Sequence, residues 1–188
     1  MAPSPQTLSV HDRQLLASWA ADCADHVLHI FDAAEPGDPR VREAIAQTRA
    51  FAAGDLDIRA AISRRGAQAG AAARDAKAPA ATAAAYAAEQ AAAVAHMGAH
   101  ALGAAGYAGK ASVLAAGGDP AEVISAEARH HVNAMSDAVA EAIRQLPALR
   151  TSRSGPLAPG RLSSGHVGAT IRAIETLLTT PTHGREQQ

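Results

Sequence analysis

The sequence predicts an all-α protein, an alanine-rich multi-helix bundle around a long central helix, with a C-terminal helix after a Pro/Gly/Ser linker. Hydrophobic residues make up 48% of the 188 positions but aromatic residues only 3%, and most of the hydrophobic residues are alanine. Alanine favours helices because it loses no side-chain entropy there. No run of β-branched or aromatic residues alternates with polar residues, so no strand is predicted.

The first three predicted helices begin and end at recognisable caps and breakers. Ser9 and Asp12 form a capping-box-like pair at the start of the first helix, and a Pro-Gly-rich segment ends it. Gly54 ends the second helix, and Asp57 caps the third. The predicted ranges are 9–33, 40–53 and 57–76.

The fourth predicted helix, over 79–116, begins at a proline and is closed by two consecutive glycines. Asp119 caps a fifth helix that continues to Leu146, and a last helix with one apolar face is predicted over 164–180. The intervening segment 147–162 is rich in Pro, Gly, Ser and Arg, which predicts a flexible linker or an ordered surface arm.

These elements predict two parts of the chain. Residues 1–146 form a helical bundle domain, and residues 147–188 form a linker plus a C-terminal helix. The apolar face of that helix must be covered, so we expect it to dock on the same domain or on a partner subunit. In the second case the chain would be a homo-oligomer.

Composition and charge argue against several classes of function. The formal net charge is −1, from 17 basic and 18 acidic residues, so no nucleic-acid partner is expected. No membrane span or signal peptide is visible, which predicts a cytoplasmic protein without a membrane partner. Cys23 is the only cysteine, so no internal disulfide forms, and a buried thiol is expected. No motif implies a cofactor.

The fourth predicted helix carries an aligned set of polar residues. It has no formally charged residue between 91 and 108, which places it at the centre of the bundle. Its polar residues fall within an arc of about 120°. Four glycines among them indicate close backbone approach or space kept open for a ligand. The polar residues are Tyr86, Glu89, His96, His100, Tyr107 and Lys110.

The first helix presents a matching face, which contains Trp19, Asp22 and His26. If this face meets the central helix, one polar cluster results, and two interpretations of it stay open. It is either a hydrogen-bond network that fixes helix register, or a pocket in which histidine acts as acid, base or ligand. The expected members are Asp22, His26, His96, His100 and Tyr107.

His96 and His100 are one helical turn apart and are the candidate metal ligands. The zinc-protease pattern requires Glu directly after the first histidine, but Met97 stands there. We therefore expect a structural or hydrogen-bonded pair, with a metal as the alternative. The adjacent His130 and His131 diverge by about 100° on a helix, and a solvated face is the expected explanation.

Two blocks of the sequence resemble a known bacterial family. The first block contains Trp-Ala-Ala-Asp-Cys-Ala at 19–24 and Asp-Pro-Arg at 38–40. The second contains Ala-His-Met at 95–97 and His-Ala-Leu-Gly-Ala-Ala at 100–105. They resemble the fifth-type immunity-like family, the putative immunity proteins linked to polymorphic toxin systems, over about 9–116. The resemblance implies an all-α protein that binds and neutralises a cognate toxin, and it supplies no catalytic residues.

Two functions follow from these observations. The first is a binding protein that neutralises or chaperones a partner protein, with contacts made by surface arginines, the linker and the last helix. The alternative is a small non-redox enzyme or ligand-binding protein, in which His96 and His100 act as acid and base and Asp22 orients a histidine. The residues expected to hold a ligand are Trp19, His26, Glu89, Tyr107 and Lys110.

Overall fold

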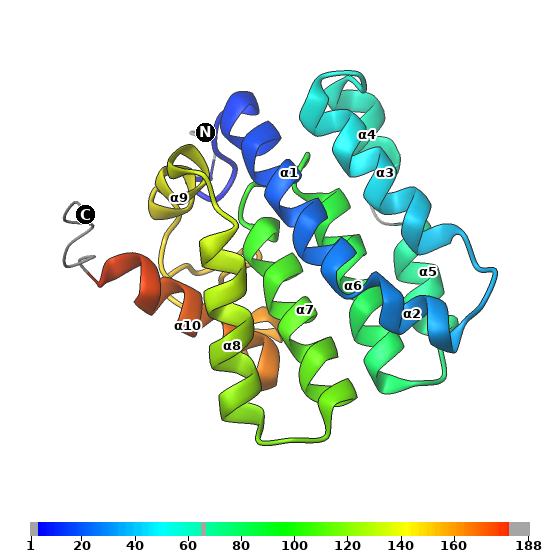
Figure 1. The fold of residues 1–188 in the computed structure, drawn as a ribbon. Coiled ribbons are helices and arrows are strands. Elements are labelled where there is room, and N and C mark those ends of the chain that lie inside the picture. The colour runs from blue at the N-terminus through cyan, green and yellow to red at the C-terminus, as the bar shows by residue number, and fades with distance from the viewer. Residues whose placement is uncertain (1–3, 65–66, 181–188) are drawn as a thin grey trace, which may run out of the picture.

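The protein is all-α, as the sequence predicts (Figure 1). The computed structural model describes residues 4–64 and 67–180, and these ranges contain helices but no strand. The helices α6 and α7 lie in the middle, with α1 across them, α3 to α5 on one side and α8 to α10 on the other (Figure 1). The helices are α1 (Val10–His26), α2 (Leu28–Ala34), α3 (Arg40–Ala53), α4 (Ile58–Arg64), α5 (Ala67–Asp75), α6 (Pro79–Ala93), α7 (His100–Ala116), α8 (Pro120–Asn133), α9 (Asp137–Arg144), the 3-10 helix η1 (Arg161–Ser163) and α10 (Gly165–Thr179).

The expected start of the first helix is confirmed, but the helix is shorter than predicted. The Ser9 hydroxyl accepts a hydrogen bond from the Asp12 amide at 3.1 Å and donates one to the Asp12 carboxylate at 2.6 Å. At Val27 the backbone leaves the helical region, with φ −107° and ψ 5°. The chain therefore forms two helices, and the second, α2, packs against α6.

The single long central helix is the main structural error of the sequence prediction. The chain turns at 94–99, and α6 and α7 pack side by side as a helical hairpin (Figure 1). Carbonyl groups of the N-terminal segment accept hydrogen bonds from amides of this turn, which would have bonded within the helix if it had continued. The Gly98 amide donates to the Thr7 carbonyl at 3.1 Å, and the Ala99 amide donates to the Gln6 carbonyl at 3.1 Å.

The same turn is held by a buried arginine and by close packing. The Arg13 guanidinium, on α1, donates a hydrogen bond to the carbonyl of Ala95, and Arg13 is only 8% exposed. A Cβ at Gly98 would lie 2.9 Å from Leu8 Cδ1, so a larger residue here would require the Leu8 side chain to shift. The turn is thus specified by residues distant in sequence.

The core is made chiefly of alanine, and α6 and α7 are buried on most of their surfaces. Small side chains let the helices approach closely, and most of the larger buried residues come from the surrounding segments. Leu16 on α1, Phe31 on α2 and Phe51 on α3 are among the largest of these. The expected central position of this segment is therefore confirmed, although two helices occupy it.

One further predicted helix is interrupted, and another lies partly outside the described residues. The range 57–76 contains α4 and α5, and residues 65–66 between them lie outside the described residues. The range 120–146 contains α8 and α9, because Ser136 accepts a hydrogen bond from the Val139 amide at 3.2 Å and caps a new helix.

The last helix, α10, packs on α7 and α8 of the same chain. Two glycines of α7 make this close approach possible. A Cβ at Gly106 would lie 3.1 Å from the Val167 carbonyl oxygen, and a Cβ at Gly109 would collide with the Thr170 side chain. Close backbone approach, one of the two explanations offered for the glycines, therefore accounts for these two positions.

The linker is an ordered arm tied to the N-terminal segment. Gln6, 1% exposed, donates a hydrogen bond from its amide nitrogen to the Ser154 carbonyl at 2.7 Å. Its amide oxygen accepts one from the Leu157 amide at 3.0 Å. No helix within the described residues is long and apolar enough to cross a membrane. The division of the chain at residue 146 stays a prediction.

Candidate functional site

Three of the polar residues of the predicted stripe lie close together, although they belong to two helices. Tyr86 on α6 and Tyr107 on α7 face each other across the hairpin, with ring centres 5.3 Å apart. The Lys110 ammonium lies 6.0 Å from the centre of the Tyr107 ring. The hairpin thus brings together residues that would lie far apart along a continuous helix.

These three residues line an open hollow of about 440 Å³, which we call the tyrosine hollow. Its opposite wall is the start of α10 together with η1. Two positively charged side chains, Lys110 from α7 and Arg161 from η1, therefore line the same hollow. The complete lining is Tyr86, Tyr107, Lys110, Arg161, Ser164, Gly165, His166 and Val167.

A second hollow of about 210 Å³, the linker hollow, shares Tyr107 and Arg161 with the first. Glu89, Gln90 and His100 line its other side. His100 Nδ1 lies 2.8 Å from Gln90 Oε1, so the ring orientation of His100 is fixed by a neighbouring amide. Burial raises the pKa of Glu89 above its usual range, while Arg74 and Arg161 oppose that shift.

Tyr107 stands between the two hollows and is only 6% exposed. Burial raises the pKa of its phenol, and Arg161 opposes this shift. Among the residues that the structure describes, its hydroxyl takes part in no hydrogen bond. The hydroxyl oxygen is not among the buried side-chain atoms that lack a partner, so it reaches solvent and is free to bond to water or to a ligand.

His96 lies apart from this arrangement. It is exposed in the turn between α6 and α7, whereas His100 begins α7 and lines the linker hollow. The two residues are therefore no longer one turn apart on a single helix face. In the described part of the chain, no group of three or more His, Cys, Asp or Glu residues could hold a metal ion. Cys23 is buried, as expected, and burial raises the pKa of its thiol.

The expected single cluster of α1 and the central helix is wrong. Asp22 is exposed and forms an ion pair with Arg49 at 3.1 Å. His26 Nε2 lies 3.3 Å from a carboxylate oxygen of Glu127, and the His26 ring stacks on His130 at 4.2 Å. The polar face of α1 therefore meets α3 and α8, and neither Asp22 nor His26 lines the hollows around Tyr107.

His131 is the residue whose environment the sequence prediction missed. It is 1% exposed instead of solvated, and the indole nitrogen of Trp19 donates a hydrogen bond to its carbonyl at 3.0 Å. Burial, and then the neighbouring His130 and His26, lower its pKa to about 3. Its Nε2 lies 3.5 Å from Glu127 Oε2, and the four-residue spacing of these two residues was the available sequence signal.

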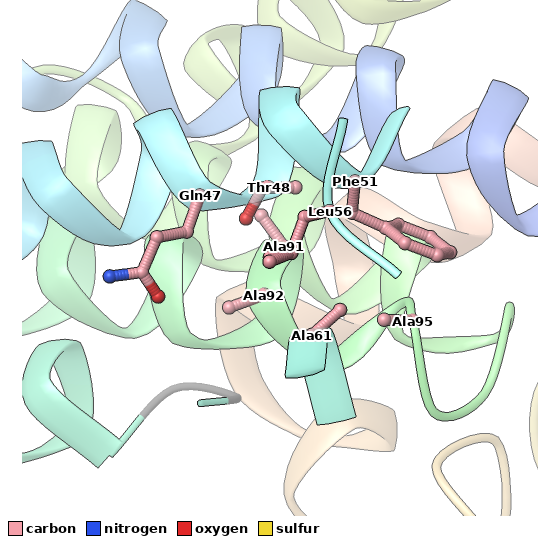
Figure 2. A pocket seen from close by; sticks show the side chains of 8 residues that line it. All are labelled: Gln47, Thr48, Phe51, Leu56, Ala61, Ala91, Ala92 and Ala95. Atoms are coloured by element: carbon pink, nitrogen blue, oxygen red, sulfur yellow. The ribbon is translucent and has the colours of Figure 1, made fainter. Parts of the chain in front are cut away.

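Two further hollows lie elsewhere in the fold. The hollow shown in Figure 2, between α3, α4 and α6, has alanine at half of its lining positions and holds about 10 Å³, room for a single water molecule at most. A larger hollow of about 560 Å³, which we call the α1–α3 hollow, is lined by residues of α1, α3 and the start of α9. Trp19, Asp22 and Arg49 are among them.

Comparison with protein families finds that residues 6–138 match the family described as Imm-5 like putative immunity protein. The match covers more than half of the 188 residues. The chain belongs to this family. The resemblance identified in the sequence is therefore confirmed. Searches of curated proteins and of solved structures found no significant match.

The hollows of this immunity-family protein differ in how much of their lining lies within the range that matches the family. Nearly all residues of the α1–α3 hollow lie within 6–138. The tyrosine hollow combines Tyr86, Tyr107 and Lys110 from the matched range with Arg161 and the start of α10, which lie beyond it. We therefore expect residues common to the family in the α1–α3 hollow, and residues particular to this chain in the tyrosine hollow.

Proposed function

We propose that this immunity-family protein binds a cognate toxin in the cytoplasm and neutralises it by forming a complex. The family match over 6–138 is the observation that carries this proposal. A family of immunity proteins acts on a partner protein, and the matched range here contains most of the buried core. The toxin is expected to contact a surface made by that range.

The α1–α3 hollow is the surface that best fits this role. It is larger than the tyrosine hollow and opens beside an exposed charge cluster. In that cluster Arg49 Nη2 lies 3.1 Å from oxygens of both Asp22 and Asp25. Exposed ion pairs of this kind contribute little to stability, so they are free to exchange partners at an interface.

The test is co-expression with candidate toxin domains from the genome that encodes this chain. The expected result is that one such domain stops bacterial growth, that this chain restores it, and that native mass spectrometry detects a complex of fixed stoichiometry. Restored growth without any complex would refute neutralisation by binding. Failure to restore growth against every toxin domain of that genome would refute the immunity function.

Matched arginine variants locate the contact. Arg49→Ala removes a charge from the α1–α3 hollow, and Arg153→Ala removes one from the exposed linker. Loss of the complex with Arg49→Ala alone would support the proposed surface. Loss with Arg153→Ala alone would move the contact to the linker, which the sequence analysis also considered.

A second function, the binding of a small ligand, is favoured by one specific observation. The nearly buried Tyr107 has no hydrogen-bond partner for its hydroxyl among the described residues. Lys110 lines the tyrosine hollow and Glu89 lines the linker hollow, which supports the ligand-binding role predicted for them. Trp19 and His26 lie on α1 and do not line these hollows, so their predicted role receives no such support.

The acid–base roles predicted for His96, His100 and Asp22 remain the less favoured form of this second function. Asp22 is paired with Arg49, and His96 lines neither hollow around Tyr107. His100 does line the linker hollow, where Gln90 fixes its ring. Small-ligand binding therefore has more support than acid–base catalysis.

A further inference from the structure

We propose that the tyrosine hollow binds a phosphate monoester, with the phosphoryl group at the start of α10 and the organic group against the tyrosine rings. The proposal rests on the ligand-binding function given above and names the chemical class of the ligand. It does not depend on the neutralisation of a toxin. Four features of the hollow carry it.

The first feature is the start of α10, a helix of 15 residues. Its cap residue, Ser164, donates its side-chain hydrogen bonds backwards, to the carbonyls of Gly160 and Arg161 at 3.0 and 3.3 Å. It therefore does not cap the helix, which begins with amides that lack an acceptor. Within the described chain, no hydrogen bond is donated by the amides of Gly165, His166 or Val167, and all three residues line the hollow.

Such amides favour an anion. The helix dipole adds positive potential at the same point, and phosphate groups bind at helix N-termini for both reasons. The hollow supplies additional positive charge. Lys110 and Arg161 both line it, and neither forms an ion pair with any residue that the structure describes, although Glu89 is close enough to Arg161 for its pKa to be affected. Two positively charged side chains outside ion pairs match the double charge of a phosphate monoester.

Tyr107 is the independent indication of a ligand. The residue is only 6% exposed and lines the hollow, and its hydroxyl reaches solvent without a protein partner among the described residues. A phosphoryl oxygen offers the acceptor that this hydroxyl lacks. The nearby carboxylate, Glu89, lines the linker hollow and not the tyrosine hollow, so it does not occupy the anion position.

The tyrosine rings indicate an ester with an organic group in place of free phosphate. Tyr86 and Tyr107 form a wall of two rings whose centres are 5.3 Å apart. The hollow of about 440 Å³ falls in the size range of small-molecule sites, which exceeds the needs of a phosphate ion. An aromatic or other flat group attached to the phosphate would cover this wall.

Isothermal titration of the full chain with phenyl phosphate tests the proposal, with benzoate and inorganic phosphate as comparison ligands. We expect saturable one-to-one binding of phenyl phosphate, tighter than that of either comparison ligand. Lys110→Gln and Arg161→Gln are each expected to weaken it about tenfold, and Tyr107→Phe about fivefold. Arg153→Gln, a charge-matched control in the linker outside the hollow, should bind as the unaltered protein does.

The possible failures are distinguishable. If benzoate binds as tightly as phenyl phosphate, the phosphate class is wrong but small-ligand binding survives. If inorganic phosphate binds as tightly, the ester with an organic group is wrong. If no probe binds up to about 10 mM, the ligand-binding function falls as well. Binding that is unchanged in both Lys110→Gln and Arg161→Gln would overturn the location. So would chemical shifts of the Gly165 and His166 amides that do not move when phenyl phosphate is added to the unaltered protein.

Discussion

Lowering the pH from 7 to 5 is expected to destabilise the fold through His131. Burial, and then His130 and His26, lower the pKa of this side chain from 6.5 to about 3, so it stays neutral in the folded protein. In the unfolded chain it titrates near its ordinary pKa and takes up a proton over this range. Its contribution to stability is therefore complete above pH 6.5 and is lost progressively as the pH falls toward 3.

The expected loss follows from the size of the pKa shift. Below pH 6.5, each pH unit favours the protonated unfolded state by about 1.4 kcal/mol. At pH 5 the free energy of unfolding should therefore be lower than at pH 7 by about 2 kcal/mol from this side chain alone. A loss of this size is a measurable fraction of the total stability of about 5–15 kcal/mol that is usual for a domain.

Urea unfolding at the two pH values, followed by the fluorescence of Trp19, measures this loss. Trp19 is the only tryptophan, is 3% exposed and bonds to the backbone of His131. His131→Gln removes the titrating ring but keeps the carbonyl that accepts this bond. We expect the unaltered protein to lose about 2 kcal/mol more than His131→Gln does. His11→Gln, at an exposed position of α1, should retain the full loss.

A strong attraction between the Glu127 carboxylate and a protonated His131 would refute this reasoning. Its Oε2 atom lies 3.5 Å from His131 Nε2, and neither atom has a hydrogen-bond partner among the described residues. If the attraction of this carboxylate outweighed burial, His131 would be protonated in the folded protein at pH 5. The unaltered protein and His131→Gln would then lose stability equally between pH 7 and pH 5.

Two further predictions concern the docking of the C-terminal part. Gly109→Ala should destabilise the protein by about 1 kcal/mol, because overpacking against Thr170 exceeds the gain in helix propensity. Adding Thr170→Ala should restore most of the urea midpoint, and Gly109→Ala at or above the original stability would contradict packing of α10 on this face. Gln6→Ala should cost about 2 kcal/mol, because the buried Leu157 amide loses its acceptor. Thermal unfolding measures this cost against Gln68→Ala at an exposed position, and equal melting temperatures would contradict it.

Features set by neighbouring residues were predictable from the sequence. The Ser9 cap joins residues three apart, Asp119 caps α8 by accepting from the Ala121 amide at 2.9 Å, and Gly54 ends α3 with φ 84°. Each depends only on local backbone geometry and on the side chain at one position. The helix starts and stops that depend on such caps therefore agree with the structure.

The candidate site was predictable only in part. The sequence singled out Tyr86, Tyr107 and Lys110 because their spacing aligns them on one helix. They meet instead because the chain folds back at 94–99, and the start of α10 supplies the other wall of the hollow. Arg161 and His166 had no sequence signal, since nothing local indicates that a linker will return to the central hairpin.

The sequence by itself determined the helical class, because abundant alanine and the absence of alternating strands leave few other structures. Only the tertiary structure decided where the central segment turns. A break in a buried helix exposes backbone groups that need partners, and those partners, the carbonyls of Gln6 and Thr7, come from the other end of the chain. The burial of His131 has the same origin, since Trp19 of α1, distant in sequence, packs against it.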